Sequence, residues 1–365
     1  MDDRVRAHAN TLVTWSARVE PGDNVVLNVS EGTHDLAVAV AAELGAVGAT
    51  LLTTYHSNEM SRAYLRSHDG DFDGNDPEVA MLEAADVYLS LMGGWNKATY
   101  ADVPGETRQQ FSRANVDARE AKHDTGGILT IHPTRALAQQ AGMSFEAYQD
   151  FVYDAVLRDW KALAEEMDRM KDYFDEGSEV RLVGTGTDLT MSIADRTAVN
   201  SAASVAYDSH NLPSGEVFTA PSATEGVITF DVPRSYRGQE IHGLQLHFED
   251  GEVVDYDAER GTDMIESILE TDDEARRLGE LGVGMNRGID RVTDHILFDE
   301  KMAGTVHVAL GRAYKSCFPE GETGNQSAVH VDLITDLREE GRMEVDGEVI
   351  LRNGVFRWED GFEDW

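Results

Sequence analysis

The stretch that decides the fold of the first half is residues 24–55, NVVLNVSEGTHDLAVAVAAELGAVGATLLTTY. It begins with a short β-rich apolar run at residues 24–29 and ends with a second such run at residues 50–55. Between them, residues 35–44 form an alanine-rich, helix-like segment that reaches Gly45. Strands that alternate with helices are typical of a mostly parallel sheet. We therefore expect the chain to begin with an α/β unit.

Further strands and one long helix extend this pattern. Residues 87–92 (VYLSLM) and residues 127–131 (GILTI) have the character of buried strands. Residues 144–173 carry an apolar stripe at helical spacing, which predicts one long helix with Ser144 as its N-cap. The pattern breaks at residues 175–178 (DEGS). We predict an N-terminal α/β domain over residues 1–176, with a mostly parallel sheet.

The second half has a different character, because short strands separated by glycine turns dominate it. Only residues 263–281 show helical periodicity over a long stretch. These features predict an α+β C-terminal domain over residues 177–365. Its predicted strands are residues 179–183, 188–193, 226–232, 244–248, 305–310 and 328–334.

The charge of the chain is strongly negative. Acidic residues outnumber basic ones by 68 to 31, and lysine occurs only at positions 97, 122, 161, 171, 301 and 315. The acids are spread among periodic apolar segments, which is typical of a folded protein rather than of an acidic tail. Salt of about 1 M shortens the Debye length to about 3 Å and would screen this surface. We therefore predict a halophile protein, and the charge argues against nucleic acid as a partner.

The cysteine content and the apolar segments bound the cellular setting. Cys317 is the only cysteine, so neither an intramolecular disulfide nor a cysteine zinc cluster is available. No apolar run approaches the roughly 20 residues of a membrane helix. The polar start MDDR does not resemble a secretory signal. These features predict a cytoplasmic protein with no membrane partner.

His330 and Asp332 form the first candidate pair for chemistry. They lie two residues apart on a predicted strand, so their side chains point to the same face. An imidazole beside a carboxylate is half of a site for a divalent metal ion. A hydrogen-bonded surface pair is the alternative for this pair taken alone.

Three more residues are candidates, each with a structural alternative. His307 is a polar residue inside an apolar strand, where a core histidine paired with the backbone is the alternative. Glu216 follows a proline and a glycine that fix a turn, and an exposed loop glutamate is the alternative. Glu280 ends the predicted helix 263–281, where a carboxylate opposes the helix dipole at a cost of roughly 0.3–1 kcal/mol. No Gly-x-Ser-x-Gly elbow is present, which argues against a serine hydrolase.

Taken in order, these segments resemble the aminopeptidase T and aminopeptidase S family of metallopeptidases. Residues 211–221 (NLPSGEVFTAP) are similar to the most distinctive stretch of that family. Weaker similarity extends through the first half, so the resemblance covers nearly the whole chain. The other matching segments are residues 280–286 (ELGVGMN), 299–301 (DEK), 304–311 (GTVHVALG) and 325–332 (NQSAVHVD).

The resemblance implies a two-domain homodimer that cleaves peptides with a free N-terminus. It also implies a centre of two divalent ions (zinc, cobalt or manganese) in the C-terminal domain. The tyrosine that the family has near its site corresponds to Tyr314, for which a core tyrosine is the alternative. The metal ligands of the family correspond to Glu216, Glu280, His307, His330 and Asp332.

Such a centre implies a mechanism for the chain. Two ions about 3.5–4 Å apart would share a water and lower its pKa. Glu216 or Glu280 would bridge the ions, and we assign the general base to Glu280. Tyr314 would donate a hydrogen bond to the developing oxyanion.

Departures from the family pattern leave two alternatives open. The chain is shorter than typical members, and Val331 stands where the classical peptidases often carry a tryptophan. The dihydroxypyridine ring-cleaving dioxygenases resemble this family in fold and hold one Fe(II) through two histidines and an aspartate. His307, His330 and Asp332 would also satisfy that set. The other alternative is a metal-binding relative without catalysis, against which the intact ligand series argues.

Overall fold

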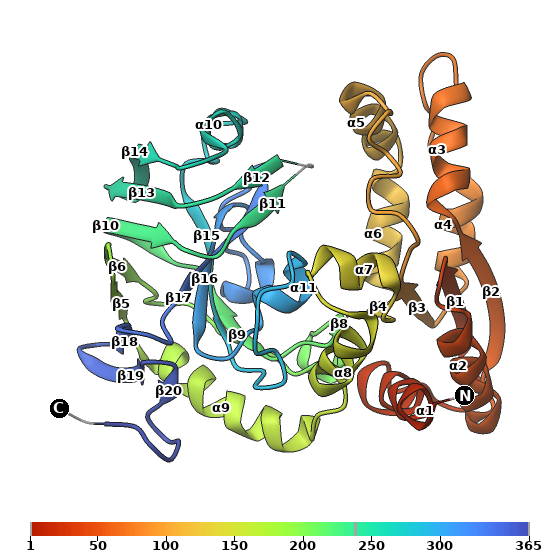
Figure 1. Cartoon of the computed structure of the whole chain (residues 1–365), viewed down its shortest axis with the longest axis horizontal. Helices are drawn as coiled ribbons and strands as arrows, with labels where there is room; N and C mark the ends of the chain where they lie inside the picture. The colour runs from red at the N-terminus through yellow and green to blue at the C-terminus, as the bar shows by residue number, and fades with distance from the viewer. Residues whose placement is uncertain (1, 237–238, 364–365) are drawn as a thin grey trace. The chain divides into compact units, whose positions relative to one another are not determined.

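The computed structural model describes residues 2–236 and 239–363, and the chain divides into two compact units (Figure 1). The first unit comprises Met1–Arg158 and Ala203–Pro213, and the second comprises Asp159–Ala202 and Ser214–Trp365. This division differs from the predicted boundary after residue 176 at two places. Helix α9 (Trp160–Glu176) belongs to the second unit, and residues 203–213 return to the first.

The first unit is built on a five-stranded parallel sheet, which confirms the predicted α/β class. The strand order is β2-β1-β3-β4-β8, and every neighbouring pair is parallel. Strand β2 lies on one side of β1, whereas the later strands lie on the other, so the order reverses between β1 and β3. The strands are β1 (Asn24–Ser30), β2 (Thr50–His56), β3 (Val87–Met92), β4 (Ile128–Ile131) and β8 (Asn211–Leu212).

Apolar side chains on both faces of this sheet hold its helices. On one face, Val26 and Tyr88 cluster with Leu82 of α4. On the other face, the alternating residues Val25, Leu27 and Val29 of β1 are also buried. Helix α2 contacts β1 and β2. Helix α2 continues past Gly45 and ends at Gly48, whose φ of +89° favours glycine. None of the helices in the described residues is long and apolar enough to span a membrane. The helices are α1 (Asp3–Asn10), α2 (His34–Val47), α3 (Asn58–Ser67), α4 (Asp76–Glu83), α5 (Gly105–Ala114), α6 (Val116–Asp124), α7 (Arg135–Gln140) and α8 (Phe145–Val156).

The single helix predicted over residues 144–173 is wrong, because the chain forms two helices there, α8 and α9. Ser144 caps α8 as predicted, since its Oγ accepts a hydrogen bond from the backbone N–H of Ala147 (3.2 Å). Asp159 explains the break. Its Oδ1 accepts from the backbone N–H of Ala162 (3.1 Å) and caps a new helix. The apolar stripe continues across the break because both helices bury one face.

The second unit contains two larger antiparallel sheets, which confirms the predicted α+β class. The eight-stranded sheet has the order β14-β13-β10-β6-β5-β18-β19-β20, and the five-stranded sheet has the order β17-β16-β15-β9-β7. A small sheet pairs β11 (Arg234–Tyr236) with β12 (Gln239–Ile241). The eight-stranded sheet consists of β5 (Glu179–Gly184), β6 (Thr187–Ser192), β10 (Ser222–Phe230), β13 (Leu244–Glu249), β14 (Glu252–Asp257), β18 (Arg342–Val345), β19 (Glu348–Arg352) and β20 (Val355–Phe356). The five-stranded sheet consists of β7 (Val199–Ser201), β9 (Glu216–Thr219), β15 (Leu278–Gly284), β16 (Thr305–Gly311) and β17 (His330–Asp336).

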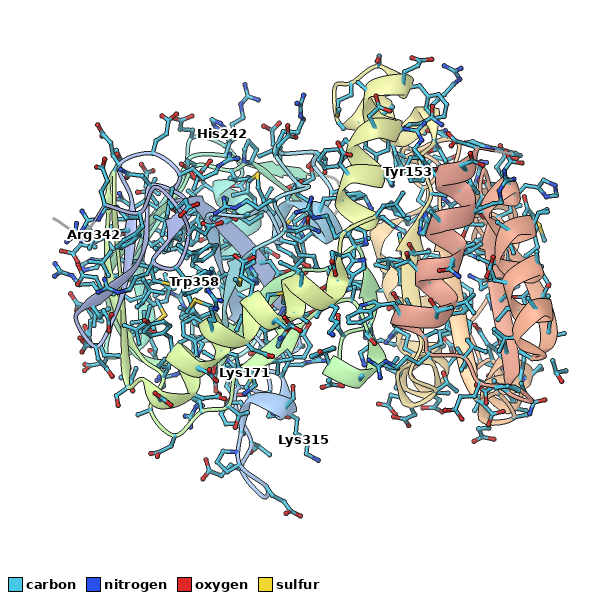
Figure 2. All side chains as sticks on the ribbon, turned by 90° about the horizontal axis from the view of Figure 1, so that it is seen from below. Tyr153, Lys171, His242, Lys315, Arg342 and Trp358 are labelled. Carbon is cyan, nitrogen blue, oxygen red and sulfur yellow. The ribbon has the colours of Figure 1, made fainter. Side chains whose placement is uncertain are left out.

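Helix α9 belongs to the second unit because it packs against β7 and β9. Asn200 in β7 donates hydrogen bonds to the carbonyl of Ala164 (3.0 Å) and to Asp168 Oδ1 (2.7 Å) on the helix. Tyr173 of α9 stacks on Trp358 with ring centroids 6.2 Å apart, and Figure 2 shows Trp358 near this helix. These contacts tie α9 to both the five-stranded sheet and the C-terminal segment.

The helix predicted over residues 263–281 is wrong in its second part. Helix α10 (Thr262–Leu269) ends at Glu270, and the chain then turns into β15. Asp272 stabilises this turn, because its Oδ1 accepts from the backbone N–H of Glu274 (3.1 Å). Glu280 therefore lies inside a strand. The interaction with a helix dipole that we inferred for Glu280 does not occur.

Candidate metal centre

All five predicted metal ligands lie in the five-stranded sheet of the second unit. Glu216 is the first residue of β9, Glu280 lies in β15, and His307 lies in β16. His330 and Asp332 lie in β17, two residues apart as predicted. Four neighbouring strands thus supply one cluster of side chains.

The register of the sheet places the five side chains on one face. Glu280 pairs with Ala309, and Ala309 pairs with Asp332 across the next strand. In the same ladders, Gly282 pairs with His307, Gly311 with His330, and Gly284 with Glu216. Paired residues in a sheet point to the same side, and side chains alternate along each strand. The side chains of all these paired residues therefore lie on the same face of the sheet.

Small residues opposite the ligands make room for their side chains. Gly282 is the clearest case, because a Cβ atom there would overlap Cε1 and Nε2 of His307. Ala309 lies between Glu280 and Asp332 in the paired strands. Gly284 serves a different purpose, because a Cβ atom there would overlap the carbonyl oxygen of Met302. The imidazole of His307 therefore crosses over β15 at the position of Gly282. Glycine is needed at this position for space.

Glu280 lies at the centre of the cluster. Its Oε1 is 3.3 Å from His307 Nε2, and its Oε2 is 3.2 Å from His330 Nε2. His330 Nε2 is also 3.2 Å from Asp332 Oδ1, and His307 Nε2 is 3.7 Å from Glu216 Oε2. The two oxygens of Glu280 thus face two different imidazoles, each of which has a second carboxylate beside it.

A backbone carbonyl fixes the orientation of His330. Its Nδ1 donates a hydrogen bond to the carbonyl oxygen of Arg312 (2.7 Å), which directs Nε2 at the carboxylates. Metal-ligating histidines commonly have this arrangement, because the second ring nitrogen donates to a carbonyl or a carboxylate.

Two polar atoms on the other side of the cluster are left without hydrogen bonds. Glu216 Oε2 and His307 Nδ1 are buried and have no hydrogen-bond partner within residues 2–236 and 239–363. Buried polar atoms are normally paired, so each exception requires an explanation. A divalent ion held by Glu216 would give this carboxylate oxygen a partner.

The electrostatics of the cluster favour positive charge. Burial opposes a charge on His330, but hydrogen bonds with Asp332 and Glu280 outweigh burial and raise the pKa of His330 to about 11. Burial also opposes a charge on His307, yet Glu280 and Glu216 raise the pKa of His307 to about 9. Burial would raise the pKa of Asp332, but the hydrogen bond from His330 holds it well below its usual value. In the absence of metal, protons on the two imidazoles neutralise the carboxylates.

The residues present fit a divalent metal centre. One donor atom from each of Glu280, His330 and Asp332 lies within 4.8 Å of the other two. Two imidazoles together with carboxylate oxygens suit zinc, cobalt or manganese. The fit rests on three observations: the shared Glu280, the oriented His330 and the unpaired Glu216 oxygen.

Tyr314 lies at the rim of the cluster and is not a core tyrosine, because the residue is 47% exposed. Its ring centroid is 5.1 Å from that of His330 and 5.3 Å from that of Phe218. Partial desolvation, and then the negative charges of Glu280 and Asp332, raise the pKa of Tyr314 above its usual value. The phenol is therefore protonated at neutral pH and available as a hydrogen-bond donor.

The family resemblance includes residues 299–301, but sequence reasoning assigned no role to Glu300 or Lys301. The Lys301 side chain is fully buried, and its Nζ is 3.3 Å from Glu216 Oε1 and pairs with Glu300. Burial opposes its charge, but Glu216 and Glu300 raise the pKa of Lys301 above its usual value. Lysine is rare in this chain, and Lys301 lies shortly before the strand of His307. The rarity of lysine and this position before the strand were the features of the sequence that could have drawn attention to Lys301.

Comparison with known families settles the class of the protein. The family described as thermophilic metalloprotease (M29) matches residues 1–356. The chain belongs to the M29 peptidase family. It is therefore a metallo-aminopeptidase, a metal-dependent hydrolase whose substrates are peptides. The predicted resemblance to the aminopeptidase T and S family is confirmed.

Named relatives agree with the M29 assignment. The chain is 30% identical over 407 aligned residues to aminopeptidase 2 of Geobacillus stearothermophilus, covering 96% of this chain and 97% of the relative. It is 37% identical over 190 residues to aminopeptidase T of Thermus aquaticus, covering 47% of this chain and 45% of that protein. Wild-type AmpT from Thermus thermophilus has a solved structure with a TM-score of 0.86 at 23% identity. That match covers 97% of this chain and 99% of the other and establishes the fold.

The M29 assignment also bears on the alternatives raised by the sequence. Neither the family nor the named relatives supports the ring-cleaving dioxygenase alternative, and the M29 relatives are named as aminopeptidases.

Proposed function

We propose that the chain removes N-terminal residues from peptides through a centre of two divalent metal ions, with Glu280 as the bridging ligand. The observation that supports two ions is the arrangement of Glu280, whose Oε1 and Oε2 face different imidazoles at 3.3 and 3.2 Å. Glu216 and His307 would complete one half of the centre. His330 and Asp332 would complete the other.

The carboxylates of the chain would handle the proton of the attacking water. Bound divalent ions supply a water of lowered pKa and a Lewis acid for the scissile carbonyl. Sequence reasoning assigns the proton acceptor to Glu280. The alternative is Glu216, because its Oε2 has no hydrogen bond and a bridging Glu280 has both oxygens engaged. The two assignments can be told apart by replacing each glutamate with glutamine and measuring the bound metal. A glutamate that only accepts the proton can be replaced without loss of metal, whereas a bridging glutamate cannot.

Two further side chains would support the reaction. Tyr314 would donate a hydrogen bond to the oxyanion that develops on the substrate carbonyl, from its place beside His330. Lys301 is a positioning residue. Burial raises the pKa of Glu216, and the Lys301 ammonium beside Oε1 opposes that rise and directs Oε2 toward His307.

Release of p-nitroaniline from leucyl-p-nitroanilide tests the proposed function. We expect turnover in about 2–3 M KCl, which screens the acidic surface, with Co²⁺, Zn²⁺ or Mn²⁺, and loss of turnover after EDTA. Glu280→Gln should lose both metal and turnover. If Glu216 serves as the proton acceptor and not as a metal ligand, Glu216→Gln should keep metal and lose turnover. Folded protein that is inactive with every metal and with several aminoacyl substrates would contradict the proposal.

Several finer predictions accompany this function. We propose that substrates need a free N-terminus, that the active form is a homodimer, and that the enzyme works in the salt-rich cytoplasm of a halophile. The net charge of -37 supports the salt requirement. Light scattering of the folded protein at high and low salt tests both the oligomeric state and the salt requirement. An N-acetylated leucyl-p-nitroanilide should not be cleaved.

A further inference from the structure

A cavity lies within the first unit, and none of the candidate metal ligands lines it. Its volume is about 550 Å³, and it lies over one face of the parallel sheet. The register identifies the face, because Thr54, Asn28, Ser90 and Leu129 are successive partners across β2, β1, β3 and β4. Asn28, Ser90 and Leu129 line the cavity. This face is the one on which Val26 and Tyr88 pack with α4.

The sheet becomes polar where it meets the cavity. Strands of a parallel sheet are buried on both faces and are normally apolar throughout. Val26 and Tyr88 follow this rule, but two residues further along the same strands the pair becomes Asn28 and Ser90. Thr54 Oγ1 donates to Asn28 Oδ1 (3.1 Å), and Asn28 Nδ2 donates to Ser90 Oγ (3.4 Å). A hydrogen-bonded polar row therefore replaces the core packing at this level of the sheet.

The cavity reaches the carboxyl ends of β1 and β3, the two strands between which the strand order reverses. In open α/β sheets, ligands bind in the crevice at this point. The loops after the two strands meet closely here. The backbone N–H of Gly94 donates to the carbonyl of Glu31 (2.7 Å), and a Cβ atom at Gly93 would lie 2.6 Å from that oxygen. Both loops line the cavity.

Basic side chains outnumber acidic ones in the lining of this cavity, unlike in the chain as a whole. Lys97 and Lys122, two of the six lysines, line the cavity together with His56 and His210. Lys122 also pairs with Glu78, its Nζ lying 2.6 Å from Glu78 Oε1. Glu31 is the single acidic residue among the described residues that line it, and it accepts a hydrogen bond from Ser57 Oγ. In a chain with 68 acidic and 31 basic residues, this composition is an exception.

We propose that this cavity binds a small organic anion. Lys97 and Lys122 would contact its carboxylate or phosphate group, and Glu31 would accept a hydrogen bond from a hydroxyl or ammonium group of the same molecule. The polar row of Asn28 and Ser90 would contact the body of the ligand. This site is independent of the metal centre and of the aminopeptidase activity.

Calorimetric titration of the metal-loaded, full-length protein tests the proposal. Glycerol 3-phosphate and malate are the probes for the two anion sources, and n-propyl phosphate and succinate are the matched probes without hydroxyl groups. We expect one equivalent of either hydroxyl-bearing probe to bind more tightly than its matched probe. Lys97→Gln should weaken that binding about tenfold, the effect of one lost charged contact. The affinity should fall as salt rises.

Controls distinguish this site from anion binding elsewhere. Lys161→Gln removes the same charge from α9, where Lys161 is exposed and pairs only loosely with Glu165 (3.9 Å), and it should leave the affinity unchanged. His330→Ala tests for binding at the metal centre and should also leave it unchanged. Lys97 lies in an exposed loop, so Lys97→Gln should fold, as circular dichroism will check.

Three results would overturn the proposal. The first is no binding of any of the four probes up to about 10 mM, an affinity too weak for a specific site. The second is wild-type affinity in Lys97→Gln. The third is loss of binding in His330→Ala, which would place the anion at the metal centre.

Discussion

Gly282→Ala is the sharpest structural test of the metal centre, because it adds one methyl group on the strand beneath His307. That methyl group would lie more than about 1 Å inside the ordinary contact distance of 3.4 Å from Cε1 and Nε2 of His307. His307 would have to move by this amount, away from Glu280 and Glu216. A misplacement of about 1 Å at a reactive centre can cost about 100-fold in rate. We expect turnover of leucyl-p-nitroanilide to fall by about this factor, together with the metal content.

Gly45→Ala is the matched control for this variant. Gly45 lies in α2, where an added Cβ atom would meet nothing within 4 Å. Alanine is favoured over glycine in a helix by about 0.5–1 kcal/mol, so this control should be slightly stabilised and fully active. The free energy of unfolding of Gly282→Ala should be about 1–3 kcal/mol lower than that of the wild type, which is the usual cost of overpacking. Wild-type turnover and metal content in Gly282→Ala would refute the role of Gly282.

Three further predictions concern the rest of the chain. Lys301→Met leaves Glu216 as a buried carboxylate without its cation. It should therefore lower the free energy of unfolding by about 3–5 kcal/mol and abolish turnover. An unchanged midpoint of urea unfolding would contradict the role of the buried pair. In the metal-free protein, the pKa values of His307 and His330 are raised to about 9 and about 11. The protonated histidines therefore stabilise the fold fully below about pH 6.5, and this contribution is lost as the pH rises through the raised pKa values. A melting temperature that does not fall between pH 7 and pH 11 would contradict this. Asp159→Ala removes the cap of α9 and should cost about 1 kcal/mol, whereas full stability in thermal melts would show that the cap is dispensable.

The first unit could be predicted well from the sequence because its strands are short apolar runs separated by helices. Residues 24–29, 50–55 and 87–92 fall within β1, β2 and β3. The wrong helix predictions have one physical cause. The spacing of apolar residues does not reveal where one element ends and the next begins when the buried face continues from one to the other. Residues 157–159 interrupt the predicted helix, and only the capping side chain of Asp159 marks the place.

The sequence suggests five candidate ligands, but it does not show how they are arranged. Glu280 was placed on a helix, yet its position in β15 next to Ala309 is what brings it between the two histidines. Lys301 was missed because a lysine ahead of a strand gives no sign that it is buried. Its role becomes visible only once the contact with Glu216 is known.

Metal titration of the apoprotein, with leucyl-p-nitroanilide turnover followed at each step, tests the central claim most directly. In wild-type protein we predict that turnover reaches its maximum at two equivalents of metal per chain and that EDTA reverses it. Glu280→Gln should bind less metal and stay inactive at every ratio. Full turnover at one equivalent of metal, or an active Glu280→Gln, would contradict a two-metal centre bridged by Glu280.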